Sequence, residues 1–356
     1  MKFWSLPFIL LFPVLAHAES SALIISGVPG DEKFAAKYSK WTETTRKILT
    51  EEMGFTPNRV IVLADEKSTQ ANIKDAFAKL KDQLKPADSF FLFLIGHGSF
   101  EDIVLGSSSS SGRNAPGGAP PLGRGAPPSL GGAPPSLNGP SGRGGQAAVG
   151  GYKFNNAGPD LTDKDISDLL STLSAGRIVV VNGTSNSGGG TEAMAAKNRM
   201  IISATKSGFE GNDTVFYEYF LNGLQKAAAD ENKDHKVSVW EAFKFAVDGT
   251  ERFYKDAGRI ATEHPQISDN GGPMTGVLPQ APVMAGLTIF NVDVPVTVAD
   301  AKLQALLNQQ KDLQQQIETL QINKASMPPD DFNKKFEDLI IKLSTVGQQI
   351  EEQKKK

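Results

Sequence analysis

Short apolar runs alternate with amphipathic segments along the first hundred residues of the chain. The runs at 22–26, 59–64 and 89–99 are rich in Ile, Val, Leu and Phe, as is typical of strands buried on both faces. Residues 32–54 and 69–85 instead carry apolar positions at helical spacing. Strands separated by helices predict a parallel sheet that is covered on both sides.

The same alternation returns after residue 160. Further strands are predicted at 177–182 and 199–205, and further helices at 160–173, 213–229 and 237–258. Because this order continues the earlier one, we expect residues 19–275 to form one doubly wound α/β domain.

A Gly, Pro and Ser-rich stretch at 103–151 interrupts this order. Three copies of a seven-residue repeat beginning "GAPP" start at Gly118, Gly125 and Gly132, and the stretch has no aromatic residue before Tyr152. Such a composition buries too little apolar surface to offset its ordering entropy, which predicts a disordered insertion. A proline-rich arm that binds a partner is the alternative.

The C-terminal part has a different pattern. After a linker or extended segment at 276–298, residues 299–356 repeat apolar positions every three or four residues on both sides of Pro328-Pro329. This predicts two amphipathic helices in an antiparallel hairpin or coiled coil. The hairpin either packs on its own domain or joins copies of the chain into a homo-oligomer.

The first residues are typical of an export signal. Lys2 precedes a short apolar core, and "AHA" at 16–18 is a small-x-small cleavage site, so 1–18 is predicted to be a removed signal peptide. The core is too short to span a bilayer. The chain has no cysteine, which excludes a lipid-anchored cysteine, disulfides and a thiol nucleophile. Export without disulfides favours a secreted or periplasmic protein of a bacterial envelope.

The formal net charge of −3 gives no electrostatic case for binding nucleic acid or anionic lipid. Candidate chemistry lies instead at two predicted strand ends. His97 lies near the end of the run at 89–99, straight after its apolar part, within "LIGHGSF", and Ser185 follows the strand at 177–182 within "VVVNGTSNSGG". Because functional groups gather at the carboxyl ends of strands in open parallel sheets, we expect both side chains to border one groove.

These motifs resemble the layout of the caspase, metacaspase and legumain superfamily of cysteine peptidases. "GHGS" (96–99) is similar to the family's histidine motif, and "TSNSG" (184–188) to its nucleophile motif. "SATKSGF" (203–209) resembles the segment that shapes the substrate cleft, and "TEHPQISDNG" (262–271) the tail of bacterial members. Without the insertion the two motifs are about 40 residues apart, near the roughly 50 of caspases. The resemblance covers about 22–275 and implies a caspase-like three-layer α/β sandwich.

Ser185 stands where this family has its cysteine. A thiol with a pKa of about 8.5 supplies some thiolate near neutral pH, whereas a serine needs a hydrogen-bonded base and a third group that orients it. The resemblance implies that His97 protonates the leaving amine and is not placed to deprotonate Ser185. We therefore expect an inactive peptidase homologue, a pseudopeptidase that binds a peptide or protein ligand or serves as a scaffold.

The sequence alone does not decide whether the chain is an enzyme. One alternative is a peptide-bond hydrolase that uses Ser185 with His97. A second is a serine esterase of the α/β-hydrolase type, because "GTSNS" (183–187) nearly matches the G-x-S-x-G elbow, with His235 or His264 as base. A third is a partner module in which the hairpin carries the function, and His97 then only caps its loop.

Glycines around the two motifs are the predicted binding residues. Backbone N–H groups near Gly98, and from Gly183 to Gly188, need no thiol to hold a carbonyl or carboxylate.

A last motif suits a hard cation. "DENKDHKVSVWE" (230–241) places Asp230, Asn232 and Asp234 at alternate positions, with Glu241 twelfth, which is the spacing of a calcium loop. Its sixth residue is His235, where the sharp turn of such loops favours glycine. A structural Ca²⁺ site is one interpretation, and a polar cap in front of the helix at 237–258 is the other. No other cofactor is predicted.

Overall fold

The computed structural model describes residues 19–101, 151–225, 229–234, 236–290 and 300–354. The predicted signal peptide and nearly all of the predicted insertion lie outside these residues. Within the part that is described, no helix is both long and apolar enough to cross a membrane.

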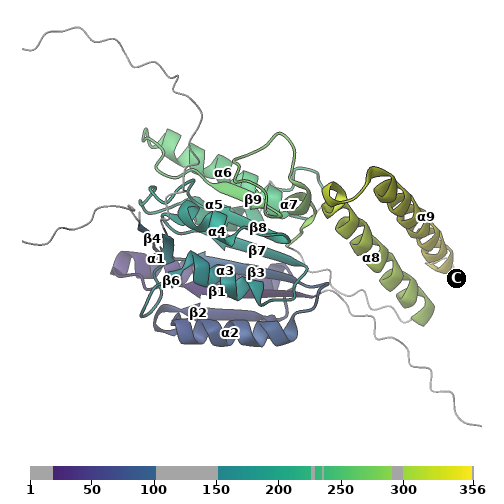
Figure 1. The fold of residues 1–356 in the computed structure, drawn as a ribbon, viewed down its shortest axis with the longest axis horizontal. Coiled ribbons are helices and arrows are strands. Elements are labelled where there is room, and N and C mark those ends of the chain that lie inside the picture. The colour runs from purple at the N-terminus through teal and green to yellow at the C-terminus, as the bar shows by residue number, and fades with distance from the viewer. Residues whose placement is uncertain (1–18, 102–150, 226–228, 235, 291–299, 355–356) are drawn as a thin grey trace, which may run out of the picture. The chain divides into compact units, whose positions relative to one another are not determined.

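The domain is built on a six-stranded sheet in the order β2-β1-β3-β7-β8-β9 (Figure 1). Neighbouring strands pair in parallel except that β9 runs antiparallel to β8. The strands are β1 (Ser20–Ser26), β2 (Val60–Ala64), β3 (Ser89–Ile95), β7 (Arg177–Asn182), β8 (Arg199–Ser203) and β9 (Gln266–Asp269).

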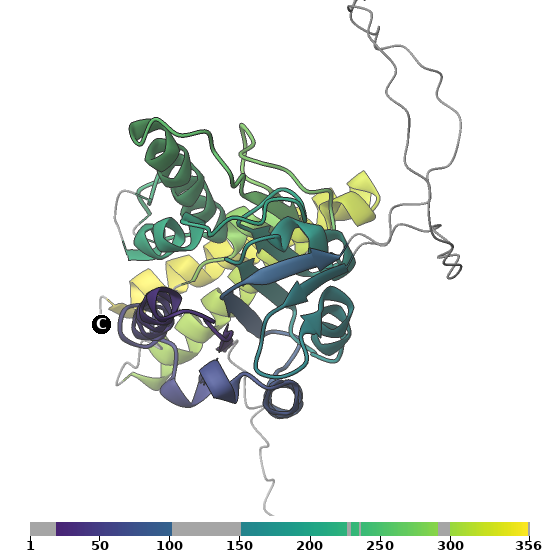
Figure 2. The same ribbon diagram turned by 90° about the vertical axis from the view of Figure 1, so that its left-hand side faces the viewer.

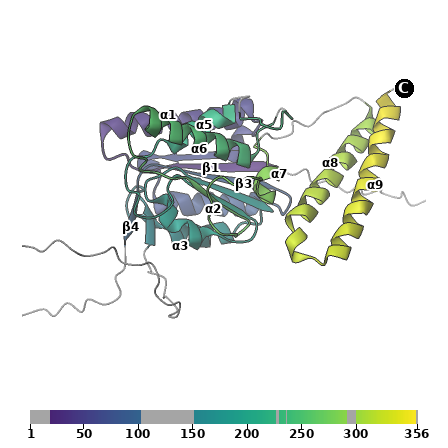
Figure 3. The ribbon, with the colours of Figure 1, turned by 90° about the horizontal axis from the view of Figure 1, so that it is seen from above.

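Helices cover both faces of this sheet (Figure 3). One face carries α1 (Glu32–Lys47), α5 (Phe216–Gln225) and α6 (Val239–Asp256), and the other carries α2 (Gln70–Gln83) and α3 (Asp163–Ser171). The predicted fold class, a three-layer α/β sandwich with a mostly parallel sheet, is therefore confirmed.

Strand β3 explains why the sheet has two cores. Successive side chains of a strand point to opposite faces, so Phe91 and Phe93 join the core under α1, α5 and α6. Phe90 and Leu92 join the core over α2 and α3. All four are fully buried, and each such side chain contributes about 1.5–3 kcal/mol of burial free energy.

Smaller elements complete the domain. β4 (Gly98–Glu101), β5 (Gly151–Phe154) and β6 (Leu161–Thr162) form a second sheet, best seen in the end-on view of Figure 2. Short helices are α4 (Thr191–Met194) and α7 (Val283–Leu287), and single turns occur at Ile48–Glu52, Pro57–Arg59, Asp65–Lys67, Ser187–Gly190 and Lys324–Ser326.

The single strand predicted at 89–99 is broken in the structure. Gly96 has φ +145, a conformation that L side chains rarely adopt, so the chain leaves β3 and turns before β4 begins. His97 consequently lies in a turn between two strands. Apolar content alone did not reveal this break.

The C-terminal helices are α8 (Ala301–Ile322) and α9 (Pro329–Lys354), which confirms the predicted helical hairpin. Their shared core contains Leu306, Leu313, Val346 and Ile350. The helices run antiparallel, as one hydrogen bond between their ends shows. The side-chain amide of Gln353, near the end of α9, donates to the carboxylate of Asp300, at the start of α8, at 2.6 Å.

Helix α3 provides a test of local stability. Thr162 Oγ1 accepts from the Asp165 N–H at 3.0 Å, and the Asp165 carboxylate accepts from the Thr162 N–H at 3.1 Å, which is a capping box. Thr162→Ala is expected to lower the free energy of unfolding by about 1 kcal/mol in urea denaturation. Thr56→Ala is the control, because Thr56 precedes a turn without making a side-chain cap bond. Equal losses in both variants would contradict the assignment.

Candidate functional site

The site lies where β3 and β7 end side by side. These strands pair in parallel, with Leu94 opposite Asn182. The chain segments that follow them therefore emerge at the same edge of the sheet, which brings the turn with His97 next to the loop with Ser185.

The hydroxyl of Ser185 forms hydrogen bonds with the backbone of Gly98 rather than with a side chain. It donates to the Gly98 carbonyl at 3.1 Å and accepts from the Gly98 N–H at 3.2 Å. Ser185 is only 4% exposed. Both hydrogen-bonding roles of the hydroxyl are therefore filled by the residue that follows His97.

Gly98 permits this close approach because it has no side chain. A Cβ atom there would lie 2.4 Å from the Ser185 carbonyl oxygen and 2.5 Å from the Tyr152 ring, both far inside contact distance. Tyr152 in turn bonds to the Thr184 hydroxyl at 2.7 Å. The glycine after the histidine is thus required by packing.

The imidazole of His97 is held by a different set of partners. Its Nε2 lies 3.1 Å from the Tyr38 hydroxyl. The Phe34 ring packs edge-on at 4.5 Å between centroids. Neither ring nitrogen is engaged with Ser185.

Burial disfavours the charged form of this imidazole. It lowers the pKa of His97 below 6.5, and Lys37 lowers it further, while Asp213 and the Pro29 backbone oppose the shift. Lys37 is itself paired with Asp213 at 2.7 Å. Burial also raises the pKa of the Tyr38 hydroxyl that contacts His97.

The predicted binding glycines donate their N–H groups inside the protein. Gly183 N–H donates to the Leu94 carbonyl at 3.0 Å, and Gly188 N–H to Thr205 Oγ1 at 2.8 Å. By contrast, the Ser185 N–H has no acceptor among the residues that the structure describes.

A pair of aromatic rings borders the loop that carries Ser185. The Phe100 ring lies against Gly189 and Gly208, where an added Cβ would come within 2.5 Å and 2.2 Å of ring atoms. Phe209 packs on Phe100 at 5.5 Å between centroids and is 74% exposed. The sequence identified the segment 203–209 as cleft-shaping, but it did not single out either ring.

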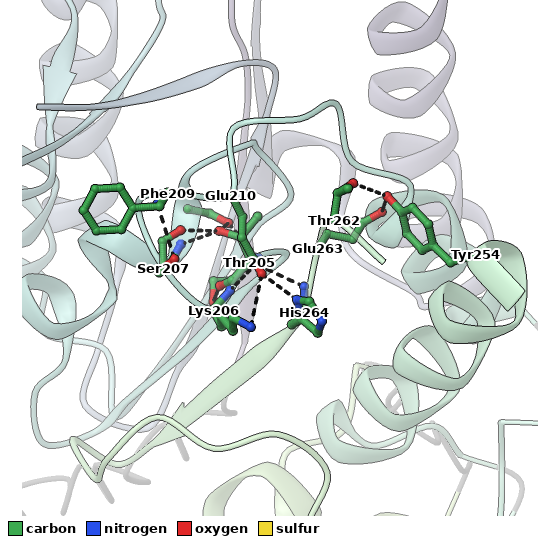
Figure 4. Close-up of polar contacts among 12 residues, drawn as sticks. Thr205, Lys206, Ser207, Phe209, Glu210, Tyr254, Thr262, Glu263 and His264 are labelled. Carbon is green, nitrogen blue, oxygen red and sulfur yellow. Dashed lines mark hydrogen bonds and ion pairs between the residues drawn. The ribbon is translucent and has the colours of Figure 1, made fainter. Parts of the chain in front are cut away.

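Glu210 ties this segment to its neighbours (Figure 4). Its carboxylate accepts from the backbone N–H groups of Lys206 and His264 at 2.9 and 3.2 Å, and from the His264 ring. Its carbonyl accepts from the Asn186 N–H at 2.9 Å. His264, one base considered for an esterase, is thus paired with Glu210, and the other, His235, lies outside the described residues.

The neighbouring Glu263 is a structural carboxylate. It is 2% exposed and accepts from the N–H groups of Val215 and Phe216 at 2.8 and 3.1 Å, at the start of α5. Tyr254 donates a third bond at 3.1 Å (Figure 4). Burial raises the pKa of Glu263, and these bonds partly offset that shift.

The candidate calcium residues form a network of local hydrogen bonds. The Asp234 N–H donates to the carboxylate of Asp230 at 3.1 Å and to the Asn232 side chain at 2.8 Å. Glu241 caps α6 in a box with Ser238. Within the described ranges, three or more His, Asp or Glu side chains are nowhere arranged to hold a metal ion. The calcium site stays a prediction.

Comparison with known proteins gives little further information. No family model matches the chain, and no curated protein matches it. Among solved structures, protein GSU0716 from Geobacter sulfurreducens is similar with a TM-score of 0.41 and 15% identity, over 72% of this chain and 94% of that one. Nothing about function follows from a likeness at this level.

The environment of His97 makes its titration a direct test of the site. We expect its ring protons in NMR spectra to titrate with a midpoint below 6.5, because burial disfavours the imidazolium. A lowered folded-state pKa stabilises the fold above the unfolded pKa, and this contribution is lost as pH falls through the folded value. His97→Gln should therefore reduce the fall in Tm on acidification from pH 7 to 5. A midpoint above 6.5 would contradict the described contacts.

Proposed function

We propose that this chain is an exported homologue of caspase- and legumain-type peptidases that binds a peptide or protein ligand without cleaving it. The observation that carries the proposal is the hydrogen bonding of the Ser185 hydroxyl to both the backbone N–H and the backbone carbonyl of Gly98. The hydroxyl donates its hydrogen bond to a carbonyl, which is not a base that can remove the proton. The serine is therefore not activated for attack.

The state of His97 supports the same conclusion. A serine hydrolase needs an imidazole hydrogen-bonded to the hydroxyl and a third group that orients the imidazole. Here the His97 Nε2 lies 3.1 Å from the Tyr38 hydroxyl, and no hydrogen bond joins the ring to Ser185 among the described residues. Hydrolysis by Ser185 with His97 therefore requires both side chains to exchange their partners first. For the esterase alternative, the His264 ring donates to the Glu210 carboxylate, as the base of a triad does. The Ser185 hydroxyl, however, is bonded to Gly98, and no hydrogen bond joins it to His264 among the described residues.

Two features equip the site to bind an extended peptide. The Ser185 N–H has no acceptor among the described residues, and in this proposal a movement of the buried loop lets it donate to a peptide carbonyl. The exposed ring of Phe209, backed by Phe100, offers an apolar surface for a neighbouring side chain. A donor beside an aromatic ring is a typical arrangement in binding sites for small ligands and peptides.

The remaining parts of the proposal rest on sequence. Secretion or periplasmic location depends on residues 1–18, which lie outside the described residues. Homo-oligomerisation through 299–356 is supported by Ile340 and Ile341, which leave 41% and 59% of their surface exposed on α9. Scaffold activity without ligand binding is the form that the proposal takes if the cleft is not used.

Exchange of the nucleophile separates a binding protein from an enzyme. The wild-type protein and Ser185→Ala are expected to cleave no member of a peptide library above the rate without protein. Ser185→Cys is expected to gain slow cleavage, because a thiol supplies a few per cent of thiolate near pH 7 without a base. Adding His97→Ala to Ser185→Cys should abolish that gain. Wild-type cleavage that Ser185→Ala removes would show a serine peptidase and contradict the proposal.

The aromatic pair provides a test of binding. For a peptide selected from a displayed library on the wild-type protein, Phe209→Ala should weaken binding by about tenfold, or ~1.4 kcal/mol. The reason is that an exposed ring on a rigid support gives up little entropy when it is covered. Ile341→Ala, an exposed apolar residue on α9, is the matched control. Equal affinity of Phe209→Ala and the wild type would place the ligand elsewhere.

A further inference from the structure

A buried carboxylate lies at the other end of the sheet, where the parallel strands begin. Asp88 directly precedes β3, and its side chain is 1% exposed. The carboxylate accepts from the Glu19 nitrogen at 2.8 Å and from the Lys85 N–H at 3.0 Å. Glu19 directly precedes β1, so the two strands begin at the same place.

No cation lies at hydrogen-bond distance from this carboxylate among the described side chains. Arg59 is 3.9 Å away and is also engaged with the Glu19 carboxylate and with Ser21 Oγ. The Lys85 ammonium acts only through its field. Burial raises the pKa of Asp88, although Arg59 and Lys85 oppose the shift. Asp88 is thus a buried acid whose charge is incompletely compensated, which is costly.

Removal of the predicted signal peptide would place a positive charge on the Glu19 nitrogen, the atom that donates to Asp88. "AHA" at 16–18, the small-x-small cleavage motif, ends immediately before Glu19. Hydrolysis of the Ala18–Glu19 bond adds water, so that Ala18 gains a carboxylate and the Glu19 nitrogen becomes an α-amine. This amine is mostly protonated at neutral pH, since its ordinary pKa is about 7.7–8.0.

We propose that cleavage after Ala18 creates an α-ammonium on Glu19 that forms an ion pair with the buried carboxylate of Asp88. The nitrogen already lies 2.8 Å from the carboxylate, so the pair forms without rearrangement. Pairing of Ser20 with Ser89, and the bond from the Ser89 N–H to the Glu19 carbonyl at 3.1 Å, hold Glu19 in this position. The present bond has an ionised acceptor only; cleavage gives it an ionised donor as well and turns it into an ion pair.

The register makes the inference specific to one cleavage site. Strand β1 rises about 3.3 Å per residue, so an end displaced by one residue moves the ammonium out of hydrogen-bond reach of Asp88. Removal of the signal peptide therefore both releases the protein and completes the edge of its sheet. This inference concerns processing and stability, and it is independent of whether the cleft binds or cleaves a peptide.

The first experiment identifies the cleavage site. The full chain, produced in a bacterial host that exports it, is recovered outside the cytoplasm and its N-terminus is sequenced. We expect the mature chain to begin at Glu19. A different first residue would overturn the proposal.

The second experiment measures the ion pair in the mature protein. The chain that begins at Glu19 is compared with the same chain carrying Gly-Ser in front of Glu19, which keeps an amide at this position. At pH 6.5 the chain that begins at Glu19 should have a Tm higher by on the order of 2 °C. Asp88 raises the folded pKa of the amine, so the difference is present below the unfolded pKa and is lost by pH 10.5.

Two variants complete the test. Asp88→Asn should remove the Tm difference at pH 6.5, whereas Asp82→Asn, an exposed acid on α2, should preserve it. Equal Tm values for the two wild-type chains at pH 6.5 would overturn the proposal. If Asp88→Asn does not fold, the comparison of the two wild-type chains at both pH values decides alone.

Discussion

Two hydrogen bonds between the Ser185 hydroxyl and the Gly98 peptide are the interaction on which the site depends. They exist because β3 and β7 pair in parallel and end together, and because Gly98 has no side chain to separate the two segments. The ring of His97 instead contacts the hydroxyl of Tyr38, which belongs to α1.

This arrangement separates the two residues chemically while keeping them adjacent in space. The hydroxyl donates to a carbonyl and the imidazole contacts a phenol, so neither raises the reactivity of the other. With a thiol in place of the hydroxyl, reactivity would not depend on the imidazole as a base. The same frame therefore suits a cysteine enzyme and, with serine, a binding protein.

The sequence predicted the layers and the meeting of the two strand ends well. Both follow from apolar runs: strands buried on two faces must be parallel and covered, and parallel neighbours end at one edge. The sequence could not predict which residue contacts His97. Tyr38 lies far away in the chain, and its approach to the imidazole depends on how α1 packs. β9 was missed because it is short and half polar. The ring pair of Phe100 and Phe209 spans two loops whose approach no periodicity encodes.

The two ends of the parallel strands differ in how their polar groups are compensated. At the carboxyl ends of the strands, the polar side chains of Ser185 and His97 have partners within the protein. At the amino ends, Asp88 is buried with amide donors and a shared arginine. The measurement that tests the account most directly is labelling by a fluorophosphonate, which modifies serines that a base activates. Mass spectrometry should find no adduct on Ser185 after prolonged incubation, and an adduct on Ser185 that His97→Ala abolishes would contradict the account.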